Sequence, residues 1–341
     1  MWGRLFMQLG LLLIFFLVLF LPLIITIIEK NLEVFLFFMG LFAVLISGGM
    51  SRALFVKVSL DPIQIAGAVF IAGLLFRWLQ RPLEKMIHGF RSLMPFRLFI
   101  GLSVFFLGLL SSVITAIIAA LVMVVIVTTL QMDRKSEIKF VVLSCFSIGL
   151  GAALTPIGEP LATIVVGKLH TSFFFLMELI GPEIIVGLLL FSVLAALVVK
   201  RQNRHYLERS RPHRKEGYEE IGVRALKIYF FVMGLEFLGE GFEPLINKYF
   251  TSLSPSLLYW INMISAVLDN ATLTAAEIGR SMSTPTLKAI LLGLLISGGM
   301  LIPGNIPNII SAGKLKITSA EWAKIGVPLG LCVMGIFYLW L

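Results

Sequence analysis

The sequence is poor in charged side chains. Asp, Glu, Lys and Arg make up 14% of its 341 residues, whereas soluble domains carry roughly 25%. Hydrophobic residues make up 58%, and the mean hydropathy is +0.99. A single soluble core cannot bury this much apolar surface, but a bilayer can accommodate about 8 to 12 elements of about 20 residues each. The composition therefore predicts an all-α polytopic membrane protein without a sizeable soluble domain.

Cysteine is scarce too, and familiar catalytic motifs are missing. Cys145 and Cys332 lie in apolar runs, so they predict neither a disulfide framework nor a metal site. The sequence contains no His-Glu-x-x-His, Gly-x-Ser-x-Gly or phosphate-binding loop. We therefore expect no cofactor and no enzyme activity. The first apolar run, residues 5–28, is too long for a signal peptide and predicts a first transmembrane helix.

The formal net charge is +9. In a membrane protein such an excess follows the positive-inside rule rather than indicating nucleic acid as a partner. Basic residues concentrate in the segments 77–97, 131–139, 200–227 and 314–324. This pattern predicts that these connections are cytoplasmic, that both termini lie outside, and that the chain is a multi-pass protein of the cytoplasmic (inner) membrane, in contact with lipid.

The apolar runs divide the chain into four parts. We expect N-terminal scaffold helices in 1–58, a first repeat in 59–200, a basic cytoplasmic loop in 201–222, and a second repeat in 223–341. Each repeat should contain a pair of short antiparallel legs and a broken transmembrane helix.

The uncharged run of about 98–130 would form a straight helix about 50 Å long, which exceeds the ~30 Å hydrocarbon core. A re-entrant hairpin with its tip near Ser111–Ala116 fits better. The second hairpin is expected at about 252–282. Clusters of Pro, Gly and polar residues predict helix breaks at 155–160 and 303–308.

Alignment of the chain with itself supports two repeats. One constant offset places Gly158 on Gly304, Glu159 on Asn305, and the sequence Gly-Lys-Leu of 167–169 on that of 313–315. Because a re-entrant hairpin does not cross the membrane, each repeat crosses it an odd number of times, and the second repeat is inverted. Inverted repeats with broken helices are typical of secondary transporters.

Polar residues at the hairpin tips and breaks form the candidate site, because broken backbone at membrane depth is tolerated only where it lines a cavity or meets an ion. Two intramembrane acids are the first candidates: Glu159 in the first break and Asp269 at the second tip. The full predicted ion- or substrate-binding set is Ser112, Thr115, Thr155, Gly158, Glu159, Asp269, Asn270, Thr272, Gly304, Asn305 and Asn308. Hard cations prefer oxygen ligands, so we expect Na⁺ at Asp269, Asn270, Glu159 and Asn305.

Other interpretations of the acids stay open. Glu159 precedes Pro160, so it could cap a helix, and Asp269 could cap the second leg of its hairpin. Glu236 lies within an apolar span and could relay protons or pair helices. An intramembrane enzyme could use Asp269 and Glu159 as an acid pair, although no hydrolase motif accompanies them.

The run Ser265-Ala-Val-Leu-Asp-Asn-Ala-Thr-Leu-Thr-Ala-Ala276 and the break Thr155-Pro-Ile-Gly-Glu-Pro160 resemble motifs of the ion transporter superfamily. The nearest likeness is to NhaD-type sodium/proton antiporters and to an uncharacterised branch of cation transporters. The resemblance implies a homodimer with a fixed scaffold and a mobile transport core. It also implies secondary active transport, exchanging Na⁺ (or Li⁺) for H⁺.

The alternative within the superfamily is Na⁺-coupled symport of a small anion, such as a dicarboxylate or an oxyanion. Symporters of this kind carry Ser-Asn-Thr motifs, but the first tip here lacks Asn. Glu159 and Asp269 would also repel an anionic substrate in a low-dielectric site. These departures favour cation exchange.

Overall fold

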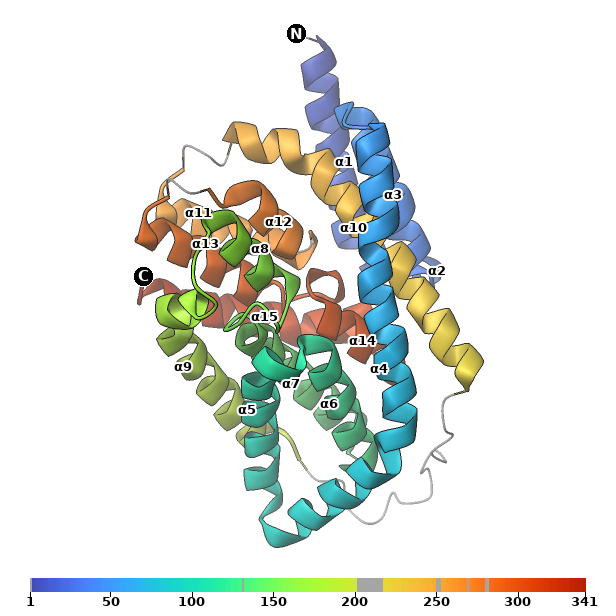
Figure 1. The fold of residues 1–341 in the computed structure, drawn as a ribbon, viewed down its shortest axis with the longest axis vertical. Coiled ribbons are helices and arrows are strands. Elements are labelled where there is room, and N and C mark those ends of the chain that lie inside the picture. Colours follow the sequence, from blue (N-terminus) through green and yellow to red (C-terminus); the bar gives the residue numbers. More distant parts are fainter. Residues whose placement is uncertain (1, 131, 201–216, 250–252, 269, 280–281) are drawn as a thin grey trace.

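The computed structural model describes residues 2–130, 132–200, 217–249, 253–268, 270–279 and 282–341. Within these ranges all regular elements are helices (Figure 1). Five of them are long and apolar enough to cross a membrane. The candidate spans are Phe6–Ile24, Arg52–Leu79, Phe96–Ile114, Phe175–Val198 and Ser319–Tyr338. The expected all-α fold is therefore confirmed for the described residues, and their apolar helices are compatible with a polytopic membrane protein.

The helices fall into an N-terminal group and two series. The N-terminal group is α1 (Trp2–Ile24), α2 (Thr26–Lys30) and α3 (Leu32–Ser47). The first series is α4 (Arg52–Leu93), α5 (Phe96–Ile114), α6 (Ala116–Leu130), α7 (Arg134–Ala152), α8 (Pro160–Leu169) and α9 (Phe175–Val198). The second is α10 (Tyr218–Tyr249), α11 (Pro255–Ile261), η2 (Asn262–Ala266), α12 (Asn270–Glu277), α13 (Thr284–Ser297), η3 (Ile302–Gly304), α14 (Ile306–Leu315) and α15 (Ser319–Tyr338).

Several boundaries differ from the sequence prediction; for example, α10 begins at Tyr218, inside the loop expected at 201–222. Helix α4 has 42 residues and continues through most of the basic stretch that was expected to be a connection. The second break begins earlier than predicted, because α13 ends at Ser297 before two glycines, and α14 starts at Ile306. Pro307 and Asn308 therefore lie in the first turn of α14, where a proline is tolerated because its missing N–H would have no helical partner.

Helices α3 and α10 pack closely through small residues. A Cβ atom at Gly40 would lie 2.4 Å from the carbonyl oxygen of Gly234, so the two backbones are nearly in contact. Small residues allow this close approach between membrane helices. Lys227 of α10 and Glu33 of α3 add an ion pair with 2.6 Å between Nζ and Oε1. Together with α1 and α4, these helices form one side of the molecule (Figure 1).

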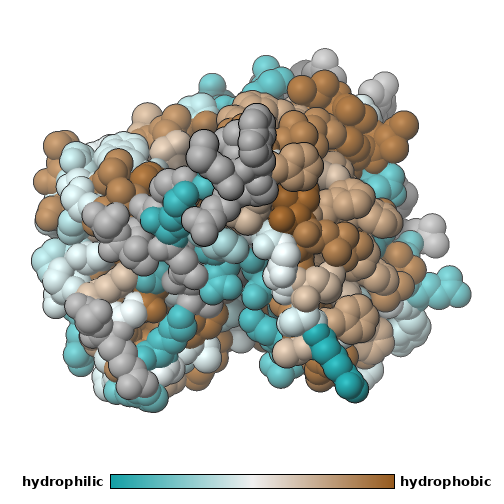
Figure 2. Space-filling model, turned by 90° about the horizontal axis from the view of Figure 1, so that it is seen from above, coloured by the Kyte–Doolittle hydropathy of each residue, from teal (hydrophilic) through white to brown (hydrophobic). Residues whose placement is uncertain are grey.

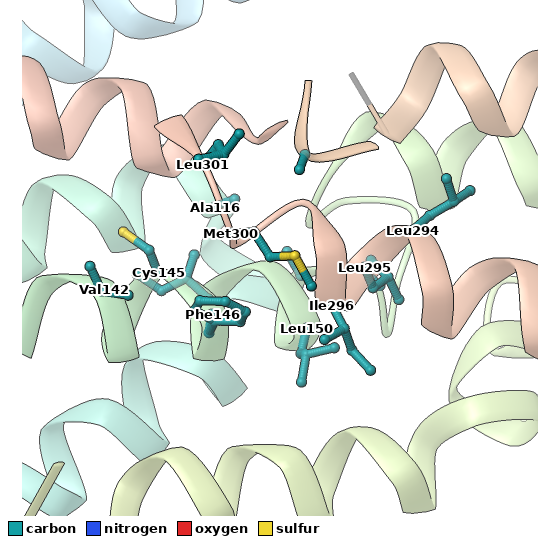
Figure 3. Packing of buried hydrophobic residues seen from close by; sticks show 14 of the residues in the cluster. Ala116, Val142, Cys145, Phe146, Leu150, Leu294, Leu295, Ile296, Met300 and Leu301 are labelled. Carbon is teal, nitrogen blue, oxygen red and sulfur yellow. The ribbon is translucent and has the colours of Figure 1, made fainter. Parts of the chain in front are cut away.

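Helices of the first series also pack against helices of the second. Helix α6 contacts α14, and α12 contacts α8, so each hairpin leg meets the half-helix of the other series. Helices α7 and α13 contact one another at the centre. Figure 3 shows Phe146 and Leu150 of α7 in one apolar cluster with Ile296 of α13 and Met300. The core thus lies where the two helix breaks begin.

The outer surface of the N-terminal group is apolar. Large hydrophobic side chains are exposed on α1, α3 and α4, among them Leu13, Phe20, Phe38, Phe55 and Leu60. In the view onto one end of the molecule, hydrophobic residues gather along one flank and hydrophilic residues lie over the middle of the end face (Figure 2). Such a flank is expected to contact lipid rather than water.

Candidate ion-binding site

The first hairpin tip and the first helix break are tied together by hydrogen bonds. Oγ1 of Thr155 donates to the carbonyl oxygen of Ser112 at 2.5 Å. The backbone N–H of Ala116, the first residue of α6, donates to the carbonyl oxygen of Gly158 at 3.0 Å. Tip and break therefore satisfy part of one another's backbone, as a buried interruption of a helix requires.

Thr115 has an unusual backbone conformation at this tip. Its φ is 73° and its ψ is 150°, a region that is essentially reserved for glycine and costs of order 1–3 kcal/mol. Its Oγ1 accepts a hydrogen bond from the N–H of Ile118 at 3.4 Å. Strain of this kind concentrates at ligand-binding and switch regions, which makes the tip a functional candidate on structural grounds.

Both halves also have a hydrogen bond from the hairpin tip to the helix that precedes the break. Ser111 donates to the carbonyl oxygen of Ile148 at 3.0 Å, and Ser265 donates to that of Leu294 at 3.2 Å. Ile148 and Leu294 are related by the offset that places Gly158 on Gly304, and Ser111 and Ser265 both lie at hairpin tips, so the tip-to-helix contact is the same in both halves.

The glycines of the two breaks are equivalent as well. A Cβ atom at Gly158 would lie 2.0 Å from the carbonyl oxygen of Ala152, and one at Gly304 would lie 2.5 Å from that of Gly298. Only glycine permits this approach of backbone to backbone. Each break therefore folds back on the end of its preceding helix in the same way.

Helices α8 and α14 have matching ends. The N-cap residues Glu159 (φ −154°, ψ 160°) and Asn305 (φ −156°, ψ 147°) are both extended, and neither side chain makes a capping hydrogen bond. At the C-caps, His170 and Lys316 are both left-handed, with φ of 51° and 52°. Glu159 thus occupies the capping position, as its place before Pro160 suggested, but its side chain does not serve as the cap.

Several predicted ligands are buried near these helix starts. Glu159 and Asn305 are each 6% exposed, and Asn308 is fully buried. Nδ2 of Asn308 donates to the carbonyl oxygens of Gly298 and Leu301, at 2.8 and 2.9 Å. Its Oδ1 is buried and accepts no hydrogen bond within the described residues. A buried carbonyl oxygen without a donor is a suitable ligand for a cation.

Asn305 connects the second break to the first series. A Cβ atom at Gly149 of α7 would lie 2.9 Å from Nδ2 of Asn305. The amide therefore packs over α7, the helix that leads into the first break. Asn270, the first residue of α12, is 3% exposed, and its Nδ2 has no hydrogen-bond partner among the described residues. Because α12 contacts α8, the second hairpin lies against the half-helix that Glu159 begins.

The remaining predicted residues are less closely defined. Asp269 lies outside the described residues, and so does the side chain of Thr272. Glu236 is half-buried in α10, which contacts α12. Within the described parts of the chain, no three His, Cys, Asp or Glu side chains cluster as a metal site.

Two polar pairs were not anticipated from the sequence. Nδ2 of Asn262 donates to Oε2 of Glu277 at 2.9 Å, with both residues buried. Lys288 of α13 and Glu183 of α9 form an ion pair with 2.5 Å between Nζ and Oε1. A signal for Glu277 was present, because the second hairpin run contains Asp269 and Glu277 as its only acids.

The described residues thus combine two helix breaks that carry buried polar groups with five helices that are long and apolar enough to cross a membrane, which indicates a helical membrane protein. The chain belongs to DUF1646, a family described as a protein of unknown function, whose family model matches residues 8–341. A search among curated proteins finds no match.

Proposed function

We propose that this protein is a secondary active transporter that exchanges Na⁺ (or Li⁺) for H⁺ across the cytoplasmic membrane. The observation that carries the proposal is the paired geometry of the two breaks: two helix starts, Glu159 and Asn305, with matching backbone angles and buried side chains. Such paired, discontinuous helices place polar groups where a transporter binds its ion, near the membrane midplane.

The proposal includes inverted repeats with re-entrant hairpins. In Figure 1 the pair α5–α6 lies in the lower half of the molecule with α14, whereas α11–α12 lies in the upper half with α8. The equivalent hydrogen bonds of Ser111 and Ser265 support the repeat. Opposite placement of the two hairpins supports its inversion, in which each hairpin enters from its own side and turns back at the polar centre.

The ion-binding set in this proposal combines acids and neutral oxygens. Glu159 and Asp269 supply charge, and Asn270, Asn305 and Asn308 supply amide groups. The strained tip at Thr115 and the carbonyl groups of the breaks complete an oxygen-rich environment suited to a small hard cation. A proton that binds to either acid removes the negative charge that attracts the cation, so cation and proton compete. That competition is the basis of exchange.

The resemblance to NhaD-type antiporters also leads us to propose a homodimer. In that arrangement α1, α3, α4 and α10 would form the fixed scaffold, and the hairpins and broken helices would form the mobile core. The close α3–α10 contact through Gly40 and Gly234 supports a rigid scaffold.

The test uses purified protein in liposomes with an acidic interior and an entrapped pH-sensitive dye. NaCl, LiCl, KCl and choline chloride are added outside in turn. Alkalinisation of the interior by Na⁺ or Li⁺, but not by K⁺ or choline, is the expected result. No response from folded protein contradicts exchange. The next measurement would then be Na⁺-dependent uptake of labelled dicarboxylates and oxyanions, which the symport alternative predicts.

A further inference from the structure

Glu277 is a buried carboxyl group that forms no ion pair with any of the residues that the structure describes. It ends α12 and is 8% exposed. Its Oε2 accepts the 2.9 Å hydrogen bond from Nδ2 of Asn262, which is its one hydrogen-bond partner among the described residues. Oε1 of Glu277 and Oδ1 of Asn262 are both buried and accept no hydrogen bond from those residues.

The two buried oxygens, Oε1 of Glu277 and Oδ1 of Asn262, both require a hydrogen-bond donor. An ionised carboxylate without a counter-charge is very costly to bury, and such a group takes up a proton instead. The protonated carboxyl gains an O–H group, which can donate where the carboxylate could only accept. The pair is therefore suited to hold one proton.

The elements that contact α12 carry several ionisable side chains, and none of those described is ion-paired with Glu277. Helix α12 contacts α8, α10, α13 and η2, and η2 contains no ionisable side chain. On α13 the one base, Lys288, pairs with Glu183 at 2.5 Å. Arg280 follows α12 in sequence and lies outside the described residues. The other ionisable side chains on the facing elements, with the N-cap of α8, are Glu159, Lys168, Glu236, Glu240, Glu243 and Lys248, besides residues near the start of α10.

We propose that Glu277, oriented by Asn262, is a proton-binding residue. It passes protons between the end of the second hairpin opposite its tip and the ion site. Asn270 begins α12 and Glu277 ends it, so the two groups are separated by about 10 Å along the helix. The proton arrives from water at the end of the hairpin opposite its tip, binds to Oε1 of Glu277, and leaves for the acids of the ion site, Asp269 and Glu159. This role rests on the proposed cation/proton exchange and adds a residue outside the ion-binding set.

The test separates proton movement from cation binding. Liposomes with wild type or Glu277→Gln are assayed for dye-reported Na⁺/H⁺ exchange and for exchange of radioactive Na⁺ against unlabelled Na⁺. Gln is isosteric and retains an oxygen for Asn262, so the fold should be kept. We expect Na⁺/H⁺ exchange to slow roughly a hundredfold, as for loss of a positioned proton-transfer group, with Na⁺/Na⁺ exchange unchanged. Glu178→Gln, at an exposed acid of α9, is the matched control and should preserve both activities.

Other outcomes overturn the assignment. If Glu277→Gln exchanges protons like wild type, Glu277 is not in the path. If it is folded and loses both activities, Glu277 belongs to the ion site itself and the relay is wrong. If Arg280→Gln abolishes proton exchange as Glu277→Gln does, the carboxylate acts in an ion pair instead of as a proton carrier.

An infrared titration keeps this proposal separate from the proposed function. In wild type, lowering the pH should produce the C=O stretch of a protonated carboxyl that Glu277→Gln lacks and Glu178→Gln retains. If wild type shows neither exchange, antiport fails, and this band alone decides whether Glu277 binds a proton. Should Glu277→Gln not fold, Glu277→Asp serves instead: its band should shift, and an unshifted band overturns the proposal.

Discussion

Thr155 and Ser112 join the first helix break to the first hairpin tip, through a 2.5 Å hydrogen bond from Oγ1 of Thr155 to the carbonyl oxygen of Ser112. Both residues are buried. The same hydroxyl accepts a hydrogen bond from the N–H of Ile157 at 3.3 Å. One side chain therefore satisfies backbone groups on both sides of the site, which makes Thr155 a structural requirement as well as a candidate ligand.

Thr155→Val should destabilise the protein by about 1–3 kcal/mol, because the buried carbonyl oxygen of Ser112 would lose its donor. It should also lower transport, since the tip would no longer be held against the break. Thermal unfolding in detergent and dye-reported exchange in liposomes measure the two effects. Thr128→Val is the control: among the described residues, Oγ1 of Thr128 donates only to the carbonyl oxygens of Val124 and Val125 in its own helix. Equal losses in both variants would contradict a special role for Thr155.

Glu159→Gln should reduce Na⁺-driven exchange while leaving the fold intact, because Gln has nearly the same shape but no charge. Hydrogen bonds to charged groups contribute about 1.5–3 kcal/mol, which corresponds to roughly a tenfold to hundredfold weaker apparent affinity for Na⁺. The measurement is the Na⁺ concentration that gives half-maximal alkalinisation. The substitution Glu178→Gln, at an exposed residue of α9, should leave that concentration unchanged. An unaltered Na⁺ dependence in Glu159→Gln would remove Glu159 from the site.

Asp269→Asn should abolish exchange without unfolding the protein. Asp269 precedes Asn270, which is buried at the start of α12. The substitution removes the negative charge next to Asn270 and keeps the shape of the side chain. An isolated intramembrane carboxylate is retained only where it has a function. Retained transport in a folded Asp269→Asn protein would show that the essential acid lies elsewhere.

The helix breaks could be found from the sequence because backbone geometry constrains residue type. Gly158 and Gly304 both lie where a Cβ atom would collide with a carbonyl oxygen, and both breaks place Pro in the first turn of the following helix. Local rules of this kind leave a visible pattern in the chain. They were sufficient to place the first break and its tip within a few residues of their observed positions.

What the sequence did not reveal depends on long-range contacts. The pair Glu277–Asn262 joins α12 to η2, and the pair Glu183–Lys288 joins α9 to α13. Neither pair has a characteristic spacing, and which face a residue presents depends on packing in three dimensions. The length of α4 was missed for another reason. Its C-terminal part is charged and polar, which suggests a loop, but this part continues the helix.

Gly151→Val should prevent stable folding. A Cβ atom at Gly151 of α7 would lie 1.9 Å from the carbonyl oxygen of Gly108 on α5, and backbone cannot move aside as a flexible side chain can. Overpacking costs typically about 1–3 kcal/mol even when side chains yield. Expression yield and monodispersity in size-exclusion chromatography report the effect. At Gly335 of α15 no atom lies within 4 Å of an added Cβ, so Gly335→Ala should be tolerated. A well-folded Gly151→Val protein would mean that α5 and α7 are farther apart.

The ion pair between Lys288 and Glu183 should stabilise the contact between α9 and α13. The side chain of Glu183 is 8% exposed and that of Lys288 is 30% exposed. Exposed ion pairs contribute about 0–1 kcal/mol, whereas breaking a buried pair costs about 3–5 kcal/mol because one charge stays buried. For this intermediate case we expect Lys288→Met to destabilise the protein by roughly 2 kcal/mol.

A double-mutant cycle distinguishes the buried charge from lost packing. Glu183→Gln in the Lys288→Met background removes the uncompensated carboxylate, so it should recover most of the lost stability. If charge burial is the cause, Lys227→Met, which breaks the more exposed pair with Glu33, should have a smaller effect. Equal destabilisation by Lys288→Met with and without Glu183→Gln would show that the two side chains are not coupled, and that the aliphatic part of Lys288 matters instead.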